Sequence, residues 1–204
     1  MVSQVRDLLH IGISVQDYGQ TAVIANVTPA FRHNNVAYER FTDQGPIAFL
    51  PMTHNRCSLV WTVPGKQAEE LIELGDADFL QLLQQRFGFR LGQLQKVGKR
   101  QAYPLKLIES TQVVRNRVVI VGNAAHSIHP VAGQGFNLAL RDIAILTELI
   151  STAEDAGDSK LLQSYVEQRE DDARRVYRFT DGLVKIFSNN STALGHLRAA
   201  GLVA

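Results

Sequence analysis

Residues 117–142, RVVIVGNAAHSIHPVAGQGFNLALRD, constrain the fold of this chain more than any other stretch. The run Val118–Val121 is continuous and β-branched, as in strands that are buried on both faces. A loop with Gly122, Gly133 and Gly135 follows, and apolar residues then recur at three- and four-residue steps, so a helix is predicted to begin near Gly135. This order directs the unpaired N–H groups of the helix's first turn, and the positive end of its dipole, at whatever occupies the loop. The expected ligand carries negative charge or develops it during a reaction.

A plain structural turn fits the same pattern, because tight connections between a strand and a helix often need the positive φ of glycine. Two better-known phosphate-binding patterns are absent from the sequence. Leu138 stands where a dinucleotide fingerprint would place a glycine, and no Gly-Lys-Ser or Gly-Lys-Thr occurs. Spacing alone therefore leaves both the ligand cradle and the plain turn open.

Composition narrows the class of protein. The chain has 204 residues, of which 45% are hydrophobic and 20% charged, as in an ordinary globular protein. A net charge of +1 gives no electrostatic argument for nucleic acid as a partner. Cys57 is the only cysteine, which excludes an internal disulfide and suits a reducing cytoplasm. Neither a signal peptide nor a membrane-spanning run is evident, so we expect a cytoplasmic protein, with peripheral attachment to the inner membrane left open.

Strands dominate the first half of the chain and helices the rest. Four β-rich runs separated by turn signals predict antiparallel hairpins, and two helices are predicted to follow them, with Asp76 as an N-cap. Residues 91–107 return to strand character, and a long helix at 158–187 carries charges of both signs, which predicts a salt-bridged outer face. The predicted strands are Ala22–Val27, Val36–Phe41, Ile47–Pro51 and Ser58–Val63, and the predicted helices are Lys66–Gly75 and Asp76–Phe87.

Val118–Val121 has the character of a central strand in a parallel sheet, and such strands need parallel neighbours covered by helices. No other strand–helix unit of that type is evident in the sequence. We therefore expect part of a nucleotide-binding sheet to be missing, so that the chain corresponds to the later portion of a longer protein.

A set of short motifs makes the sequence recognisable. The central ones are Gly122-Asn123-Ala124-Ala125-His126, His129-Pro130, Gly133-Gln134-Gly135-Phe136-Asn137-Leu138 and Arg141-Asp142. Others run along nearly the whole chain, among them Arg40-Phe41-Thr42, Cys57-Ser58-Leu59-Val60-Trp61, Phe87-Gly88-x-Arg90-Leu91-Gly92 and Tyr103-Pro104-Leu105. Together they resemble the class A flavoprotein aromatic hydroxylases, in the branch that serves ubiquinone biosynthesis.

This resemblance implies a chain of mixed fold class, α+β in one part and α/β in the other. An antiparallel substrate-domain sheet with helices would cover residues 1–108, and the C-terminal part of a Rossmann-like FAD-binding domain with long helices would cover residues 109–204. Asn123 stands where most of the family has an aspartate that bonds a flavin hydroxyl, and its amide can still bond a hydroxyl. The family's N-terminal βαβ unit with its pyrophosphate-binding glycines is absent, and only Ser3 and Arg6 would remain of a second motif.

The resemblance also implies an activity. The longer enzyme would be an FAD-dependent monooxygenase that uses NAD(P)H and O2, through a flavin C4a-hydroperoxide, to hydroxylate a polyprenyl-methoxyphenol, while the protein supplies binding, orientation and electrostatics. Phe49, Pro51 and Trp61 are candidate substrate walls, although each also fits a core position. We identify no metal site and no general base, and His126 and His129 are predicted to order the loop. The implied cofactor-binding residues are Gly122, Asn123, Pro130, Val131, Gly133, Gly135, Phe136 and Asn137.

A second hypothesis competes with this one. The chain could be a catalytically silent remnant that folds, buries an exposed edge by self-association as a homodimer and does not bind FAD. Under either hypothesis we expect the isolated chain to bind FAD weakly or not at all, because the pyrophosphate loop is the main anionic anchor of the cofactor. Association with a quinone-synthesis complex stays open.

Overall fold

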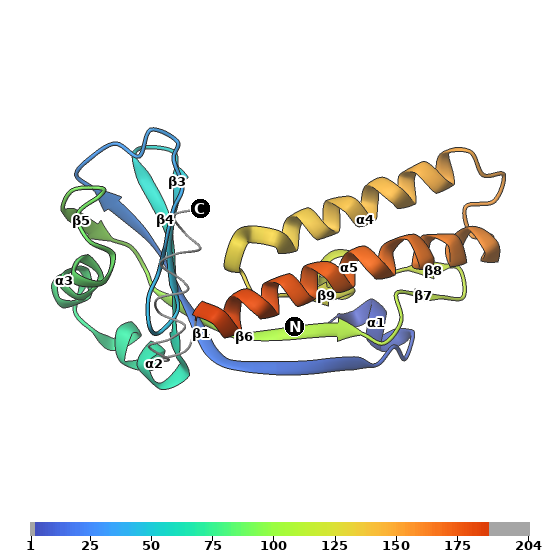
Figure 1. Ribbon diagram of the computed structural model, residues 1–204, viewed down its shortest axis with the longest axis horizontal. Coiled ribbons are helices and arrows are strands. Elements are labelled where there is room, and N and C mark those ends of the chain that lie inside the picture. The colour runs from blue at the N-terminus through green and yellow to red at the C-terminus, as the bar shows by residue number, and fades with distance from the viewer. Residues whose placement is uncertain (1–2, 188–204) are drawn as a thin grey trace. The chain divides into compact units, whose positions relative to one another are not determined.

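The computed structural model describes residues 3–187, which divide into two compact units. The first unit contains Met1–Tyr18 and Lys106–Leu183, and the second is built on Gly19–Leu105. Strands β1 (Ile13–Pro29) and β6 (Gln101–Ser110) each run from one unit into the other (Figure 1). The chain passes between the two units after Tyr18 and again after Leu105.

The second unit is an antiparallel sheet packed against two helices. Within residues 3–187 the strands of the main sheet follow the order β2-β3-β4-β1-β6-β9, and β5 pairs with β1. The hairpins expected from the turn signals are present, since β2 pairs with β3 and β3 with β4, both antiparallel. The elements of this unit are β2 (Tyr38–Phe41), β3 (Pro46–Met52), β4 (Arg56–Pro64), α2 (Gly65–Glu73), α3 (Asp76–Phe87) and β5 (Leu94–Val97).

The core of this unit forms where the apolar face of the sheet packs against the apolar stripe of α3. Alternate residues of β3 and β4 point to one face, and Phe79, Leu83 and Phe87 form a stripe along α3. The ring of Phe87 lies 4.3 Å from that of Phe49, and the ring of Phe79 lies 5.6 Å from that of Trp61. Burial of these aromatic side chains fixes α3 on the sheet.

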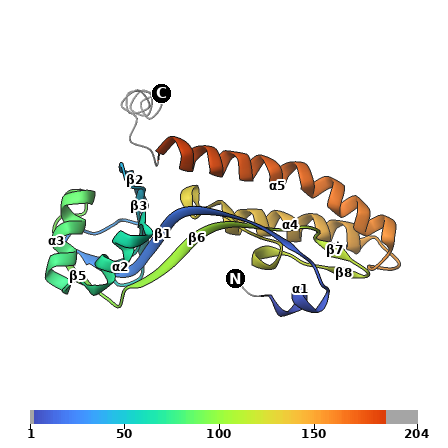
Figure 2. The ribbon, with the colours of Figure 1, turned by 90° about the horizontal axis from the view of Figure 1, so that it is seen from below.

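The first unit holds the glycine-rich stretch. Helices α4 and α5 lie side by side in both views of the ribbon (Figure 1, Figure 2). Asp158 begins α5 by accepting hydrogen bonds from the backbone N–H groups of Lys160 and Leu161 at 2.9 and 3.0 Å. The elements of this unit, besides parts of β1 and β6, are α1 (Gln4–Leu8), β7 (Val114–Arg115), β8 (Val118–Val119), the 3-10 turn η1 (Gly122–Ala124), β9 (His126–Ser127), the 3-10 turn η2 (Val131–Gly133), α4 (Gln134–Ser151) and α5 (Ser159–Phe187).

The structure corrects the prediction of a central parallel strand. Val118 and Val119 form only a short strand, which pairs antiparallel with Val114–Arg115 in a separate two-stranded sheet. The pairs β1–β4, β1–β5, β2–β3, β3–β4, β6–β9 and β7–β8 are antiparallel. The β-branched run has the composition of a buried parallel strand, but the described residues provide no parallel neighbour for it, and Val118 is exposed.

Three smaller predictions need correction. Gly75, rather than Asp76, is the N-cap of α3, and Asp76 lies in the first turn, where its carboxylate accepts a hydrogen bond from Arg100 at 3.0 Å. Strand β1 begins nine residues before the predicted Ala22, and its first five residues are exposed although Ile13 and Val15 are apolar. Arg169 was expected on the outer face of α5 but is buried.

Candidate functional site

The start of α4 has the geometry that the glycine pattern predicts. Gly133 is its N-cap, with φ at +59° in the left-handed region, and no side chain caps the helix. A Cβ on Gly133 would meet no atom within 4 Å, so open space adjoins this residue. The first turn of α4 contains no acidic residue. An uncapped N-terminus of a long helix beside open space favours an anion or a group with developing negative charge.

The turn η1 is held by residues from two other segments. Gly122 adopts φ +62°, which allows the chain to turn sharply after β8. The carbonyl oxygen of Ala124 accepts hydrogen bonds from the Arg6 guanidinium at 3.1 Å and from the Ser110 hydroxyl at 2.9 Å. Arg6 is buried, although it is a charged residue from the N-terminal helix. The segment with Ser3 and Arg6 therefore contacts the turn that carries the exposed Asn123.

His129 orders the loop between β9 and α4. Its side chain is buried, and Nδ1 accepts a hydrogen bond from the backbone N–H of Val131 at 3.1 Å. Burial lowers the pKa of His129 to about 4, so the imidazole is neutral near pH 7 and Nδ1 is free of a proton to accept this bond. The ring also packs edge-on against Tyr18, with centroids 5.4 Å apart. These contacts agree with the loop-ordering role predicted for His129.

His126 and Asp142 form a second buried group behind the loop. The Asp142 carboxylate accepts a hydrogen bond from Nε of Arg169 at 2.7 Å, and its other oxygen lies 3.5 Å from Nε2 of His126. Burial lowers the pKa of His126, partly offset by the charge of Asp142. The sequence signalled the Arg141-Asp142 motif, but the partnership with Arg169 is a contact between distant residues that no spacing reveals.

The cofactor-binding residues proposed from sequence fall into two groups. Asn123, Pro130, Phe136 and Asn137 are exposed around the glycine loop, and Phe136 is 73% exposed. The Val131 side chain is buried, so it can contribute to a ligand site only through its backbone. These residues lie in η1, in η2 with its N-cap Pro130, and in the first turn of α4.

The substrate-wall residues proposed from sequence lie elsewhere. Phe49 and Trp61 are 0% and 1% exposed and face the helices α2 and α3 in the core, while Pro51 is partly buried. Strand alternation places their neighbours Ala48, Leu50 and Val60 on the opposite face of the sheet. Phe49 and Trp61 therefore pack in the core of this unit.

Comparison with known proteins decides the family. A family described as "FAD binding domain" matches residues 1–180. The chain belongs to this FAD-binding-domain family. Ubiquinone hydroxylase UbiL of Rhodospirillum rubrum is 41% identical over 204 residues, which cover 98% of this chain and 48% of that protein. The 3-demethoxyubiquinol 3-hydroxylase of Escherichia coli is 32% identical over 206 residues, which cover 99% of this chain and 52% of that protein.

Solved structures agree on the fold. HpxO of Klebsiella pneumoniae, complexed with FAD, matches with a TM-score of 0.68 at 18% identity, and the match covers 95% of this chain and 52% of that one. The chain spans about half the length of the curated relatives it matches. Within residues 3–187, no helix combines the length and apolar composition needed to cross a bilayer.

The residues of the glycine loop fit one part of FAD. The uncapped start of α4 and the open space beside Gly133 suit the flavin ring, whose reduced form is negatively charged. The exposed amide of Asn123 can bond a hydroxyl of the cofactor. The 204 residues contain no glycine fingerprint for the pyrophosphate, so the fit is to the ring end of the cofactor.

Proposed function

We propose that the protein represented by this chain hydroxylates a polyprenyl-methoxyphenol in ubiquinone biosynthesis, with FAD as cofactor, NAD(P)H as reductant and O2 as oxygen source. The names of the relatives support the pathway, since UbiL is a ubiquinone hydroxylase and the Escherichia coli relative acts on demethoxyubiquinol. The observation that carries the proposal is the uncapped N-terminus of α4 behind Gly133.

The chain's own contribution is electrostatic. When bound, the reduced flavin supplies the activation of oxygen. Backbone N–H groups of Gly135–Asn137, in the first turn of α4, would face the ring edge that becomes negative and stabilise it, as the donors of an oxyanion hole do. No side-chain cap competes for these donors, so the helix end is ready to accept an anionic edge.

The loop before α4 would hold the ring in position and keep water away. The exposed Pro130 would cover the reacting edge of the ring. Neutral His129 fixes the backbone of Val131 through Nδ1, so the loop presents Pro130 in one conformation.

A titration with two flavins tests the ring site. Because the pyrophosphate anchor is absent, we expect the purified chain to bind FAD and riboflavin with similar, weak affinities, followed by flavin fluorescence. Gly135→Val should abolish this binding by placing a side chain on the first turn of α4. Gly182→Val is the matched control, because it also adds a side chain to a helical glycine with room for a Cβ. Tight, stoichiometric FAD binding would contradict the missing anchor, and equal effects of both variants would contradict the ring site.

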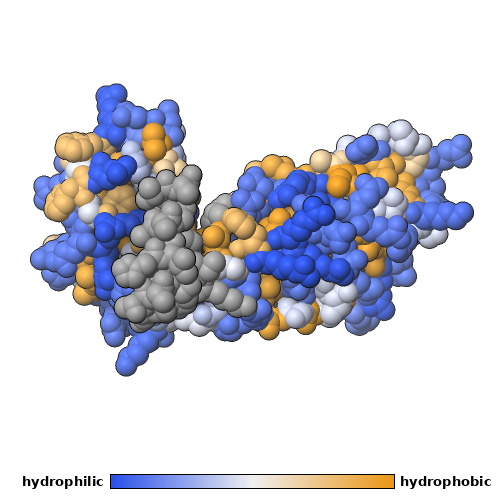
Figure 3. All heavy atoms as spheres, in the orientation of Figure 1, coloured by the Kyte–Doolittle hydropathy of each residue, from blue (hydrophilic) through white to orange (hydrophobic). Residues whose placement is uncertain are grey.

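The silent remnant remains the second candidate, and the surface of α4 favours it. Apolar side chains lie exposed along this helix, where Figure 3 shows hydrophobic atoms at the surface, and they include Phe136, Leu140 and Ile143. Such a stripe is typical of a surface that is buried by another protein segment. Under this hypothesis the chain self-associates in sedimentation experiments and Leu140→Glu makes it monomeric, while neither flavin binds at any concentration.

A further inference from the structure

Two hydrogen-bonded loops of the second unit each carry an exposed phenylalanine. Phe31 is 62% exposed and Phe89 is 71% exposed. The loops are joined by backbone hydrogen bonds from Phe31 N–H to the Leu91 carbonyl at 3.0 Å and from Ala30 N–H to the Gln93 carbonyl at 2.8 Å. The two phenylalanines therefore belong to loops that are joined to each other rather than to independent segments.

These loops are rigidly supported. The Gln84 side chain donates to the carbonyl oxygens of Gly88 and Gly92 at 2.7 and 3.2 Å and accepts from the Leu94 N–H at 2.8 Å. Gly92 has φ +70°, and a Cβ there would lie 3.0 Å from the ring of Phe31. A buried amide that satisfies three backbone groups holds the loop between Gly88 and Leu94 in one backbone conformation.

An exposed arginine follows each exposed phenylalanine. Arg32 comes directly after Phe31, and Arg90 comes directly after Phe89. A third exposed arginine, Arg40, is on strand β2. Among the residues that the structure describes, none of these three guanidinium groups forms an ion pair.

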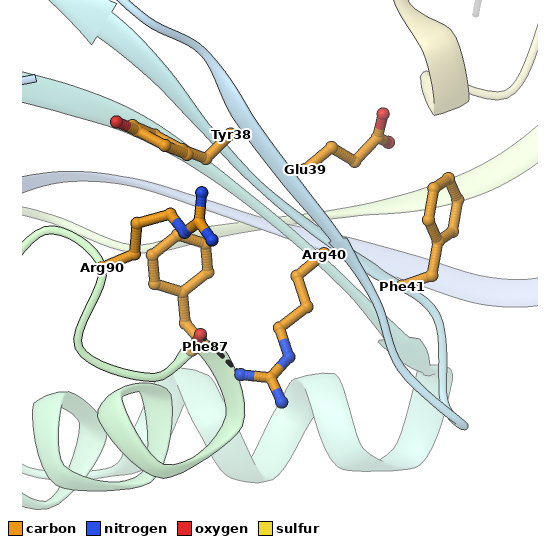
Figure 4. Close-up of a pocket in the computed structure, with 6 residues that line it drawn as sticks. All are labelled: Tyr38, Glu39, Arg40, Phe41, Phe87 and Arg90. Carbon is orange, nitrogen blue, oxygen red and sulfur yellow. Dashed lines mark hydrogen bonds between the residues drawn. The ribbon is translucent and has the colours of Figure 1, made fainter. Parts of the chain in front are cut away.

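Arg40 and Arg90 meet at a hollow of about 510 Å³, shown in Figure 4. Arg40 donates to the Phe87 carbonyl oxygen at 2.7 Å at the end of α3. Alternation along β2 brings Tyr38 and Arg40 to the side of Phe87 and Arg90. Glu39 also lines the hollow, and its carboxylate is directed away from the guanidinium groups of Arg40 and Arg90 in Figure 4. The lining of the hollow therefore combines two guanidinium groups and aromatic side chains with one carboxylate, that of Glu39.

We propose that Phe31, Arg32, Phe89 and Arg90, together with Arg40, form a surface that docks this protein onto an anionic phospholipid membrane. We name it the Phe–Arg surface. The two rings enter the boundary between headgroups and acyl chains, and the hollow between Arg40 and Arg90 binds a lipid phosphate. Arginine suits this role because its planar fork bonds phosphate oxygens in pairs.

A lipid surface fits these features better than a protein or nucleic acid does. Exposed phenylalanines beside arginines are the side chains with which peripheral proteins enter an anionic interface. A net charge of +1 over the whole chain gives no extended basic surface for nucleic acid. All five residues belong to the second unit, so the surface does not depend on flavin binding in the first.

Vesicle sedimentation with the purified chain tests the proposal. We expect binding to phosphatidylcholine vesicles that contain phosphatidylglycerol, weaker binding as salt rises, and little binding to pure phosphatidylcholine. Phe89→Ser should weaken binding several-fold, and Arg90→Gln by about fivefold, the effect expected for one basic residue at an anionic surface. Phe89 and Arg90 are exposed, so both variants should keep the far-UV circular dichroism spectrum of the parent chain.

Matched controls use exposed residues outside the Phe–Arg surface. Lys66→Gln and Lys99→Gln each remove one exposed positive charge from the same unit, and both should bind vesicles nearly as the parent does. Failure of the parent chain to bind anionic vesicles, or an equal loss in the lysine and arginine variants, would overturn the proposal. Arg90-dependent binding of inorganic phosphate without vesicle binding would assign the hollow to a free anion and also overturn it.

Discussion

Nε of Arg169 donates a hydrogen bond of 2.7 Å to the Asp142 carboxylate, and the two residues are only 5% and 4% exposed. This pair joins α5 to α4 behind the helix end that faces the proposed flavin site. Arg169 also donates to Asp172 at 2.6 Å, and Asp172 accepts from Arg141 of α4 at 2.9 Å. Two charged links between the same helices fix their register, and thereby the position of the α4 N-terminus.

Breaking the buried pair should be costly. Arg169→Met leaves the Asp142 carboxylate buried without its strongest donor, and removing one partner of such a pair typically costs about 3–5 kcal/mol. We expect a loss of this size in the free energy of unfolding, measured by urea denaturation. Arg169→Met combined with Asp142→Leu should recover much of it, because no uncompensated charge is left in the interior.

A surface pair supplies the control. Lys106 and Asp17 are 3.1 Å apart with both side chains largely exposed, so Lys106→Gln should leave the urea midpoint nearly unchanged. If Arg169→Met were as mild as Lys106→Gln, the pair would not hold the two helices together.

Acid should destabilise the first unit through His129. Burial holds its pKa at about 4 in the folded chain, below the ordinary value of 6.5. The unfolded chain therefore binds the proton more readily, so stability is fully present above about pH 6.5 and falls as the pH drops toward 4. The contribution of this residue between about pH 7.5 and about pH 5 is on the order of 2 kcal/mol.

His129→Asn isolates that effect. The amide oxygen can accept from Val131 N–H but cannot be protonated in this range, so the variant should lose less stability between neutral pH and pH 5 than the parent does. Unfolding by urea at the two pH values gives the comparison. An identical pH dependence in parent and variant would show that other groups cause the acid sensitivity.

Gly45 should be intolerant of any side chain. Its φ is +146°, and a Cβ would lie 2.7 Å from the backbone carbonyl oxygen of Thr62, which cannot move aside without disturbing β4. We expect Gly45→Ala to lower the thermal midpoint by more than Gly19→Ala. Gly19 also has positive φ, but an added Cβ would meet no atom within 4 Å. Gly19→Ala should therefore lose only the stability due to backbone strain, about 1 kcal/mol. Equal shifts for the two variants would refute the steric argument.

Sequence reasoning recovered the elements whose signal is local. The antiparallel strands from Ala22 to Val63, the helix Asp76–Phe87 and the start of α4 near Gly135 follow from alternation, a three- and four-residue stripe, and glycines at a turn.

What sequence reasoning missed depends on contacts between distant residues. Phe49 and Trp61 have the composition of a substrate wall and of a core, and only the position of α3 shows that they face the core. Arg169 is one of many charges on α5, and only the proximity of Asp142 explains its burial. The β-branched run at Val118 predicted burial in a parallel sheet, but its pairing depends on which strands lie beside it.

The contact between Arg40 and the end of α3 should depend on Gly88. Gly88 has φ +89°, and a Cβ there would lie 3.0 Å from Nη1 of Arg40, the atom that donates to the Phe87 carbonyl. Gly88→Ala therefore introduces backbone strain and also displaces the guanidinium. Together these effects should lower the free energy of unfolding by about 1–2 kcal/mol. Arg40→Met already removes the guanidinium, so Gly88→Ala in that background should lower the free energy of unfolding only through backbone strain. The difference between the two backgrounds is a coupling energy, which we expect to be at least about 0.5 kcal/mol. A double-mutant cycle by urea denaturation measures this coupling, and strict additivity would show that the close approach of Gly88 to Arg40 does not contribute to stability.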